Sequence, residues 1–412
     1  MGERFDAVVI GGGPGGATAA LLLARAGWSV ALAERKMFPR RKVCGEYLSA
    51  TNLPLLDQLG LGEDVRDRAG PPVRRVALFA GDRLLAARLP RLAGRPGPWG
   101  RALGRESLDT LLLEQALAAG IALFQPCTVR GLRWDGSAYA CAIDGNRCLR
   151  SRIVIAAHGY WEPGPLPTQP RASPAAPDDL LAFKAHFVDT GLPPDLMPLL
   201  AFPGGYGGMV HSDRGRVSLS CCVRRDRLAA VRDSHSCELA GEAVLAHILD
   251  SCRGVREALA RARRDGPWLA AGPLRTGIRI RANGGLFLVG NAAGEAHPVV
   301  AEGISMAMQS AWLLARRLIA RGSNHDDWHA VGDDYARAWR RAFGPRLRAA
   351  AVYAHWAMRP AAVAAALPLL RAFPSLLGWG ARLSGKATRV VGRQAPYNGS
   401  DRRTAASRTH RR

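Results

Sequence analysis

The sequence is short of acidic residues. Its 412 residues include 34 Asp and Glu against 57 Lys and Arg, which gives a formal net charge of +23. The excess arginine is scattered, for example at Arg74-Arg75, Arg224-Arg225 and Arg340-Arg341. Such a charge fits attraction to an anionic membrane or to nucleic acid, and it equally fits a solvated basic surface. A non-enzymatic basic binding protein therefore stays open on charge alone, although nothing indicates a specific nucleic-acid site.

The sequence also lacks the cysteine spacing of a metal site. None of its eight cysteines forms a CxxC pair, and no histidine is spaced with them as zinc would require, so no metal site is predicted. Cys221 and Cys222 lie side by side in a strand-like run, where they should face opposite sides of a sheet as small buried residues. No secretory signal precedes the first strand-like run, which favours a reducing cytoplasm with free thiols.

Long apolar runs are absent as well. Residues 360–383 are apolar, but Pro360, Pro368, Arg371 and Pro374 interrupt them. The remaining stretches are far shorter than the roughly 20 residues that a membrane-spanning helix needs. This segment could lie in a membrane interface or close a substrate pocket. We therefore expect a cytoplasmic protein, with peripheral attachment at the inner membrane face as an alternative.

The most informative feature that is present lies near the N-terminus. A strand-like run, Ala7–Ile10, leads into Gly11-Gly12-Gly13-Pro14-Gly15-Gly16 and then into a helix of small residues. Gly11 permits a tight turn, Gly13 lets a pyrophosphate approach the backbone, and Gly16 lets the helix pack closely on the sheet. Glu34, followed by Arg35, ends the next apolar run, where a carboxylate can bind both ribose hydroxyls. The pattern predicts a site for an unphosphorylated adenosine, such as that of FAD or NAD.

A second glycine-rich corner occurs roughly 280 residues later. The run Leu286–Gly290 continues through Asn291, His297 and Pro298 into Gly303-Ile304, where a helix is predicted to start. A strand followed by small residues and a helix start again favours bound anions. Two such corners indicate a cofactor with two ends to hold, and a nicotinamide enzyme needs only the first.

Together these motifs resemble the flavoprotein superfamily of para-hydroxybenzoate hydroxylase and the geranylgeranyl reductases, over about residues 5 to 320. The family carries a Gly-Asp-Ala-Ala-Gly segment whose acid holds the ribityl chain, and here Asn291 replaces that Asp. Arg105 resembles the family arginine that contacts the cofactor, and Val129 matches the strand that covers the adenine. The resemblance implies that FAD binds.

The resemblance extends to two further segments. Arg41-Lys42-Val43-Cys44-Gly45 is similar to the reductases' Lys-x-Cys-Gly segment beside the flavin, which makes Cys44 a candidate proton donor or nucleophile and a wall of the cofactor site. Arg41 and Lys42 would stabilise anionic reduced flavin. Pro203-Gly204-Gly205-Tyr206 resembles part of the reductases' pocket motif, so Tyr206 could bind a substrate oxygen. Among the histidines, His297 has the best case for chemistry.

The predicted fold is α/β (mixed α+β): a Rossmann-like FAD-binding domain, a second antiparallel β-sheet substrate domain and a C-terminal helical extension. The expected boundaries are 1–175 with 271–330 for the first, 176–270 for the second, 331–385 for the helical region and 386–412 for a basic disordered tail. Residues 73–100 could join the substrate domain.

The predicted function is that of an FAD-dependent oxidoreductase of secondary metabolism with a small hydrophobic substrate. One reaction is hydroxylation of an aromatic or polyketide-like ring, and the alternative is reduction of a C=C bond in an isoprenoid or lipid-like substrate. Ala156-Ala157-His158-Gly159 stands where the family has Gly-Ala-Asp-Gly, whose Asp helps to place reduced nicotinamide. Loss of this Asp counts against direct use of nicotinamide and favours a flavodoxin, a ferredoxin or a separate reductase as the electron donor, with NADH or NADPH as the alternative.

Overall fold

A five-stranded parallel sheet organises one part of the structure, a computed structural model that describes residues 2–89, 99–235, 238–281, 284–323, 325–386 and 390–391. All pairs in this sheet are parallel. Continuous apolar runs buried on both faces are typical of parallel strands, and every residue of the two central strands is buried. The strand order is β20 (Leu286–Leu288), β12 (Ile153–Ala156), β2 (Ala7–Ile10), β3 (Val30–Ala33) and β8 (Ala122–Phe124).

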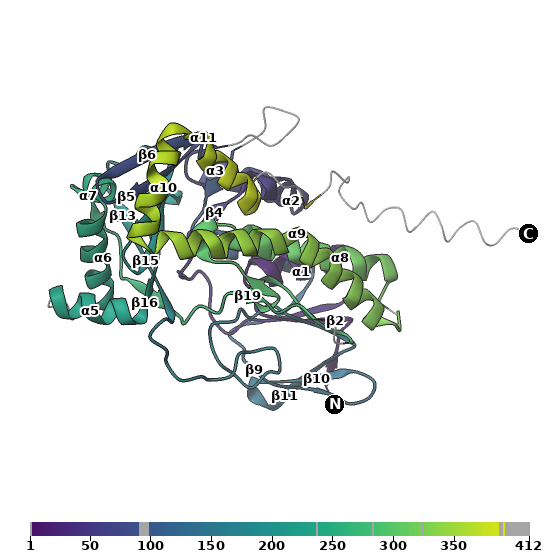
Figure 1. Ribbon diagram of the computed structural model, residues 1–412. Coiled ribbons are helices and arrows are strands. Elements are labelled where there is room, and N and C mark those ends of the chain that lie inside the picture. Colours follow the sequence, from purple (N-terminus) through teal and green to yellow (C-terminus); the bar gives the residue numbers. More distant parts are fainter. Residues whose placement is uncertain are drawn as a thin grey trace, which may run out of the picture.

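Helices cover one face of this sheet and a smaller sheet covers the other (Figure 1). On the helical side, α1 (Pro14–Arg25) packs against both α4 (Arg105–Ala118) and α8 (Gly303–Arg321). The smaller sheet has four strands in the order β1 (Glu3–Arg4), β11 (Arg147–Ser151), β10 (Tyr139–Ile143) and β9 (Val129–Trp134). This three-layer arrangement confirms the predicted Rossmann-like fold.

An eight-stranded sheet forms the second part of the structure and confirms the predicted second sheet. Its strand order is β17 (Arg263–Arg264), β13 (Leu180–Val188), β16 (Val217–Arg224), β15 (Gly205–His211), β14 (Leu196–Phe202), β5 (Arg75–Ala80) and β6 (Arg83–Arg88), with β18 (Leu269–Ala271) beside β13. Its pairs are antiparallel except for the parallel pair of β14 with β5. Residues 75–88 thus lie in this sheet, and the domain boundaries given above stay a prediction.

The two faces of the eight-stranded sheet have different surroundings. Cys221 belongs to a core shared with α5 (Arg225–His235), α6 (Ala240–Ser251) and α7 (Arg253–Leu259), which cover the outer face. Cys222 belongs to a separate core on the opposite face, as the side-chain alternation of a strand predicts.

A long helix, α9 (Trp328–Ala357), joins the two parts. At 1.5 Å per residue its 30 residues span about 45 Å. Trp339 and Phe343 near its middle pack into the core of the parallel sheet, whereas Ala354 and Ala357 at its end pack against the eight-stranded sheet. The chain continues into α10 (Pro360–Ala372), α11 (Ser375–Ala381) and a single π-helical turn, η6 (Arg382–Lys386).

Short elements complete the fold. Two small two-stranded sheets pair β4 (Tyr47–Leu48) with β7 (Arg101–Ala102) and β19 (Gly277–Ile278) with β21 (Gly294–Glu295). Further short helices are η1 (Ala50–Asn52), α2 (Leu53–Gln58), α3 (Gly62–Arg68), η2 (Asp144–Asn146), η3 (Asp213–Gly215), η4 (Gly290–Ala292) and η5 (Pro298–Val300). Of the predicted basic tail, residues 387–389 and 392–412 lie outside the described residues.

Candidate active site

The first glycine corner has the geometry that the sequence predicts. Gly11 follows β2 with a φ of +105°, a backbone conformation that favours glycine. A Cβ on Gly16 would lie 1.8 Å from the carbonyl oxygen of Gly11, so only glycine lets α1 begin this close to the strand. Glu34 is buried at the end of β3, and its Oε2 accepts a hydrogen bond of 2.7 Å from the amide of Gly12. The carboxylate therefore sits directly beside the glycine turn.

The second glycine corner meets the first. Gly290 leaves β20 with a φ of +59°, and the chain passes through η4, β21 and η5 to the start of α8 at Gly303. A Cβ on Gly15 would lie 3.2 Å from the carbonyl oxygen of Ala307, in the first turn of α8. The two helix starts thus converge although about 290 residues separate them. Both present free N–H groups and the positive end of a helix dipole to one space.

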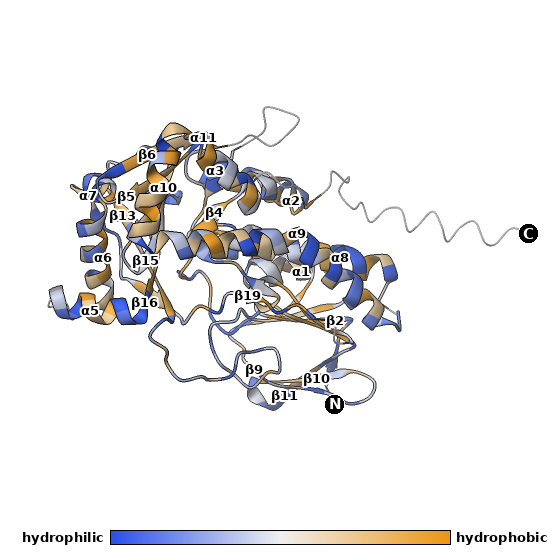
Figure 2. Ribbon diagram, in the orientation of Figure 1, coloured by the Kyte–Doolittle hydropathy of each residue, from blue (hydrophilic) through white to orange (hydrophobic). Residues whose placement is uncertain are grey.

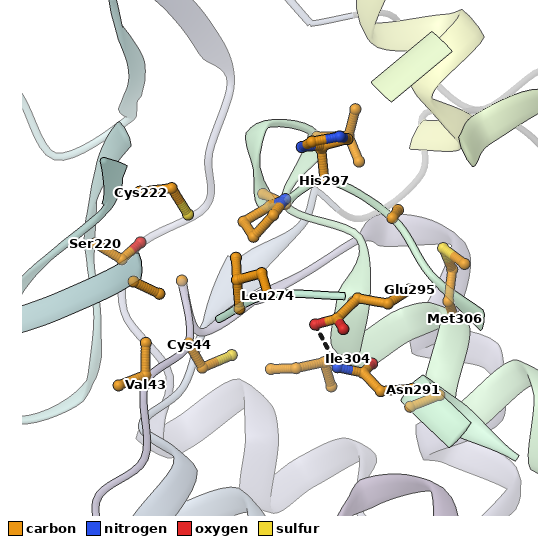
Figure 3. A pocket seen from close by; sticks show the side chains of 18 of the residues that line it. Val43, Cys44, Ser220, Cys222, Leu274, Asn291, Glu295, His297, Ile304 and Met306 are labelled. Carbon is orange, nitrogen blue, oxygen red and sulfur yellow. Dashed lines mark hydrogen bonds between the residues drawn. The ribbon is translucent and has the colours of Figure 1, made fainter. Parts of the chain in front are cut away.

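That space is a cavity of about 920 Å³. The predicted cofactor contacts that line it are Gly11, Gly13, Pro14, Gly15, Glu34, Arg35, Lys42, Cys44, Gly45, Arg105, Val129, Gly290, Asn291, Pro298, Gly303 and Ile304. The three predicted catalytic residues, Cys44, Tyr206 and His297, also line it. In Figure 3, Cys44 and Cys222 enter the pocket from one side, and Glu295 and Asn291 enter from the other.

Gly16 and Arg41 are the predicted cofactor contacts that do not line the cavity. The guanidinium of Arg41 turns toward Asp265, with Nη1 2.7 Å from the carbonyl oxygen and Nη2 3.0 Å from Oδ2. Its Nε also lies 3.6 Å from Glu106. Arg41 therefore links its loop to the second sheet and does not face the glycine corners.

Arg105 is the cation that does face them. It is buried, and two hydrogen bonds of 2.7 and 2.6 Å from its guanidinium to Asp109 fix its orientation. Its Nη2 would lie 3.6 Å from a Cβ on Gly13, and the guanidinium interacts with the thiol of Cys44. Lys42 lies nearby, where burial, Arg105 and Arg40 lower its pKa to about 8. The cavity thus carries positive charge where a pyrophosphate would approach.

Tyr206 and His297 form a pair. The phenol oxygen lies 3.2 Å from Nδ1 of His297, whose Nε2 lies 3.3 Å from the hydroxyl of Thr276. Burial raises the pKa of Tyr206 well above its usual value, and burial lowers the pKa of His297. Both groups are therefore neutral near pH 7, and the tautomer of His297 sets which partner donates in each of its two hydrogen bonds.

Glu295 is a cavity residue that the sequence patterns did not single out. It is 4% exposed, and its Oε1 accepts hydrogen bonds from Trp161 Nε1 at 2.6 Å and from Asn291 Nδ2 at 2.8 Å, the latter drawn in Figure 3. Among the residues that the structure describes, its Oε2 has no hydrogen-bond partner, although Arg279 lies 3.9 Å away. Burial raises the pKa of Glu295 to about 7. The position of Glu295 in the sequence, four residues after Asn291 and inside the small-residue corner, could have indicated that it lies in the cavity.

A second buried cluster supports the Cys44 loop. Glu46 has a φ of +62° and is fully buried, where it forms ion pairs with Lys184 and with His186, the latter at 2.9 Å. Burial alone would raise the pKa of Glu46, but the hydrogen bond from His186 and the charge of Lys184 lower it overall. Because Lys184 and His186 lie on β13, this cluster ties the loop to the second sheet. In the sequence, this cluster could have been inferred only from Lys184, a lysine within an apolar strand.

Comparison with known proteins identifies the family. Residues 4–330 match the model of the FAD binding domain family. The chain belongs to this family. It is therefore an FAD-dependent oxidoreductase, as the sequence predicts.

Three relatives illustrate the range of the similarity. The chain is 25% identical over 369 residues to conditioned medium factor receptor 1 of Dictyostelium discoideum, which is 82% of this chain and 68% of that protein. It is 26% identical over 370 residues to digeranylgeranylglycerophospholipid reductase 2 of Methanopyrus kandleri, which is 83% of each chain. It is 45% identical over 67 residues, 16% of each chain, to 6-methylpretetramide 4-monooxygenase of Streptomyces rimosus. With other curated relatives, such as menaquinone reductase of Mycobacterium tuberculosis, the match spans 38% of the relative's length.

Solved structures share the fold. The myxobacterial chondrochloren halogenase CndH has a TM-score of 0.73 at 22% identity, covering 92% of this chain and 91% of its own. A geranylgeranyl bacteriochlorophyll reductase-like protein from Thermoplasma acidophilum has a TM-score of 0.68 at 19% identity, covering 87% and 88%. At these identities the likeness shows the fold alone.

The residues present fit FAD. A Cβ on Gly13 would meet no atom but Nη2 of Arg105 within 4 Å, so the backbone there is open to a phosphate. Glu34 lies at one end of the cavity wall, and the orphaned Oε2 of Glu295 lies beside Asn291 at the second corner. A carboxylate oxygen without a partner in a buried site is a place for a ligand hydroxyl or N–H to bind.

Proposed function

We propose that this chain is an FAD-dependent monooxygenase that hydroxylates a hydrophobic aromatic or polyketide-like substrate. The observation that carries the proposal is the uneven polarity of the cavity. Three of its polar side chains, Tyr206, His297 and Glu295, lie near the second glycine corner, apart from the charged residues Glu34 and Arg105 at the first. A further stretch of the wall is apolar and comes from β5, β14, the connection between β18 and β19, and the helices after α9: Leu78, Leu199, Leu274, Val363, Leu370 and Leu377.

This arrangement suits a substrate with one polar ring and an apolar remainder. Tyr206 can bind a ring oxygen, because its hydroxyl reaches the cavity and His297 orients it. The apolar wall would hold the rest of the molecule and exclude water from the reacting end. When bound, reduced FAD supplies the redox chemistry. One oxygen atom of O₂ then enters the ring as a hydroxyl group in place of a hydrogen, and the other leaves as water.

The overall reaction needs two electrons from outside the chain. We propose reduced nicotinamide, NADH or NADPH, as the donor, with a donor protein as the alternative. His158 lines the cavity with its ring held between the carbonyl oxygen of Gly159 at 2.7 Å and the hydroxyl of Thr168 at 2.8 Å. Burial lowers the pKa of His158 to about 4, so it adds no positive charge to this wall. Anaerobic reduction of the holoprotein with each nicotinamide tests the donor.

The decisive experiment is a product analysis of the holoprotein. Phenols and naphthols with and without long alkyl chains are supplied under ¹⁸O₂ with each nicotinamide, and in parallel with photoreduced protein. We expect a product that carries one labelled oxygen atom, formed fastest from the alkylated rings. Product formation that continues without oxygen, or a product that carries no label, would reject the monooxygenase assignment.

Reduction of a C=C bond is the second candidate, favoured by one observation. Cys44 reaches the cavity as a half-buried thiol in contact with Arg105. A thiol placed there could deliver the proton that alkene saturation needs, with hydride from the cofactor adding to the other carbon. This reading predicts that a long-chain alkene gains two hydrogen atoms under anaerobic conditions, and that Cys44→Ala abolishes the gain without loss of bound FAD.

A further inference from the structure

The last helices that the structure describes carry an exposed apolar surface. More than half of the exposed large hydrophobic residues in the described part of the chain lie between residues 352 and 383. The largest exposed fractions there are 60% for Trp379, 57% for Phe373 and 55% for Leu369. In Figure 2, α10 and α11 stand at the edge of the molecule, coloured largely toward the hydrophobic end of the scale. We call residues 352–383 the C-terminal apolar surface.

The charges around this surface have one sign. No Asp or Glu occurs between Tyr335 and Ser400. The side chains of Arg359, Arg371 and Arg382 are exposed along the same segment. Within the residues that the structure describes, Arg371 and Arg382 have no acidic partner. Exposed leucine and aromatic residues next to unpaired arginines are typical of helices that lie in the plane of an anionic membrane.

The surface is continuous with the cavity. Trp356, Leu369 and Leu376 are exposed to solvent and also line the cavity wall. α10 has no buried residue, so this helix has an apolar wall on one side and solvent on the other. Among the described residues, no single helix is long and apolar enough to cross a membrane; α10 and Ser375–Lys386 meet the length and hydropathy only together, and the chain bends by 113° between them.

We propose that the C-terminal apolar surface binds the anionic face of a lipid bilayer, with α10 and α11 lying in the interface and the cavity mouth turned toward the lipid. The absence of acids disfavours a second copy of this chain as the occupant, because two such surfaces would bring only like charges together. The proposal goes beyond the proposed function and does not depend on which reaction the cavity supports.

The test is flotation of the FAD-loaded full chain with vesicles. One set of vesicles contains phosphatidylglycerol and phosphatidylcholine, and the other contains phosphatidylcholine alone. The apolar variant carries Phe373→Gln, Trp379→Gln and Leu383→Gln, which avoid the cavity wall. A matched control carries Leu117→Gln, Trp134→Gln and Leu239→Gln, which are exposed elsewhere. A third variant carries Arg359→Gln, Arg371→Gln and Arg382→Gln.

We expect the wild type and the matched control to float with anionic vesicles, and the apolar variant to partition about tenfold less. The arginine variant should lose the preference for anionic over neutral lipid. Bound FAD, read from the visible spectrum, should be equal in all four proteins. A wild type that stays unbound, or an apolar variant that floats as well as the control, would overturn the proposal. So would a concentration-dependent dimer that the apolar variant abolishes while no protein floats.

Discussion

Trp161 and Glu295 are joined by a hydrogen bond of 2.6 Å between Nε1 and Oε1 across the wall of the active site. Trp161 lies in the connection between the two sheets, and Glu295 lies in the second glycine corner. Nζ of Lys42 lies 5.3 Å from the ring centroid of Trp161, so the indole contacts both a cation and the carboxylate. The bond fixes one oxygen of Glu295 and leaves the other facing the site without a partner.

The first prediction concerns Glu295 and pH. Burial raises its pKa to about 7 in the folded state, whereas an unfolded chain keeps an ordinary value near 4.5. Between these values the native state holds a proton that the unfolded state loses, so the contribution of Glu295 to stability is highest below pH 4.5 and falls as pH rises to about 7. Urea unfolding should show that Glu295→Gln lacks this loss, which is on the order of a few kcal/mol.

The groups that face Glu295 define the control for that prediction. Lys42 and Arg279 favour its ionised form, and Tyr206 and Cys222 lie within reach of its charge. Glu162 is an exposed acid next to Trp161 in sequence, so Glu162→Gln should leave the pH dependence unchanged. If Glu295→Gln and the wild type keep a constant difference in unfolding free energy from pH 5 to 8, Glu295 does not titrate as we expect.

The second prediction concerns the first glycine corner. Gly16→Ala places a methyl group 1.8 Å from the carbonyl oxygen of Gly11, and neither backbone can move without opening the turn. We expect protein that purifies without the yellow colour of bound FAD and unfolds at lower urea concentration. Gly344→Ala in α9 is the matched control, because its Cβ meets no atom within 4 Å. That control should keep FAD and gain up to about 1 kcal/mol from helix propensity.

Short-range chemistry explains what could be predicted from the sequence. The strand, the glycines and the acid at Glu34 follow one another within 30 residues, and each has a local physical reason. The end of α4 has a similar local cause, because Gly120, with a φ of +88°, lies just past it. The alternation of a strand sufficed to place Cys221 and Cys222 on opposite faces.

Long-range pairing explains what was missed or wrong. Arg41 lies beside Cys44 in sequence, yet its partner Asp265 is 224 residues away, so no local pattern fixes its direction. Glu46 and Lys184 are 138 residues apart, and each alone reads as a surface charge. β14 contains Pro198, and the pairing of this strand with β5 and β15 holds it in the sheet.

The third prediction concerns the end of the described chain. Glu302 is fully buried before α8, and Nζ of Lys386 lies 3.2 Å from its Oε1, with Arg346 at 3.9 Å. Removing one partner of a buried ion pair costs about 3–5 kcal/mol because the other charge stays desolvated. Lys386→Met should therefore lower the free energy of unfolding and speed proteolysis within residues 360–386.

A double variant separates charge from packing at this pair. Glu302→Gln with Lys386→Met removes both charges of this pair, so it should recover part of the lost stability, while the buried Arg346 loses its ion pair with Glu302. Arg382→Met changes an exposed cation in the same turn and should have little effect. Equal cleavage rates in Lys386→Met and Arg382→Met would show that the pair does not hold the C-terminal helices.

The last prediction concerns Tyr206 and follows from the proposed function. Tyr206→Phe removes the hydroxyl that pairs with Nδ1 of His297, while the ring stays in its buried site. We expect unchanged FAD content and a fall of about 10²-fold in the rate of product formation, since positioned acid–base groups contribute that much or more. His297→Gln should lower the rate by a similar factor, and the double variant should lower it no further because the two residues act as one unit. Tyr353→Phe supplies the comparison, because Tyr353 lines the same cavity and its hydroxyl donates to the carbonyl oxygen of Gly380, at 3.3 Å. If Tyr206→Phe and Tyr353→Phe turn over at equal rates, Tyr206 acts as a wall of the cavity, and the oxygen of the substrate must be bound elsewhere.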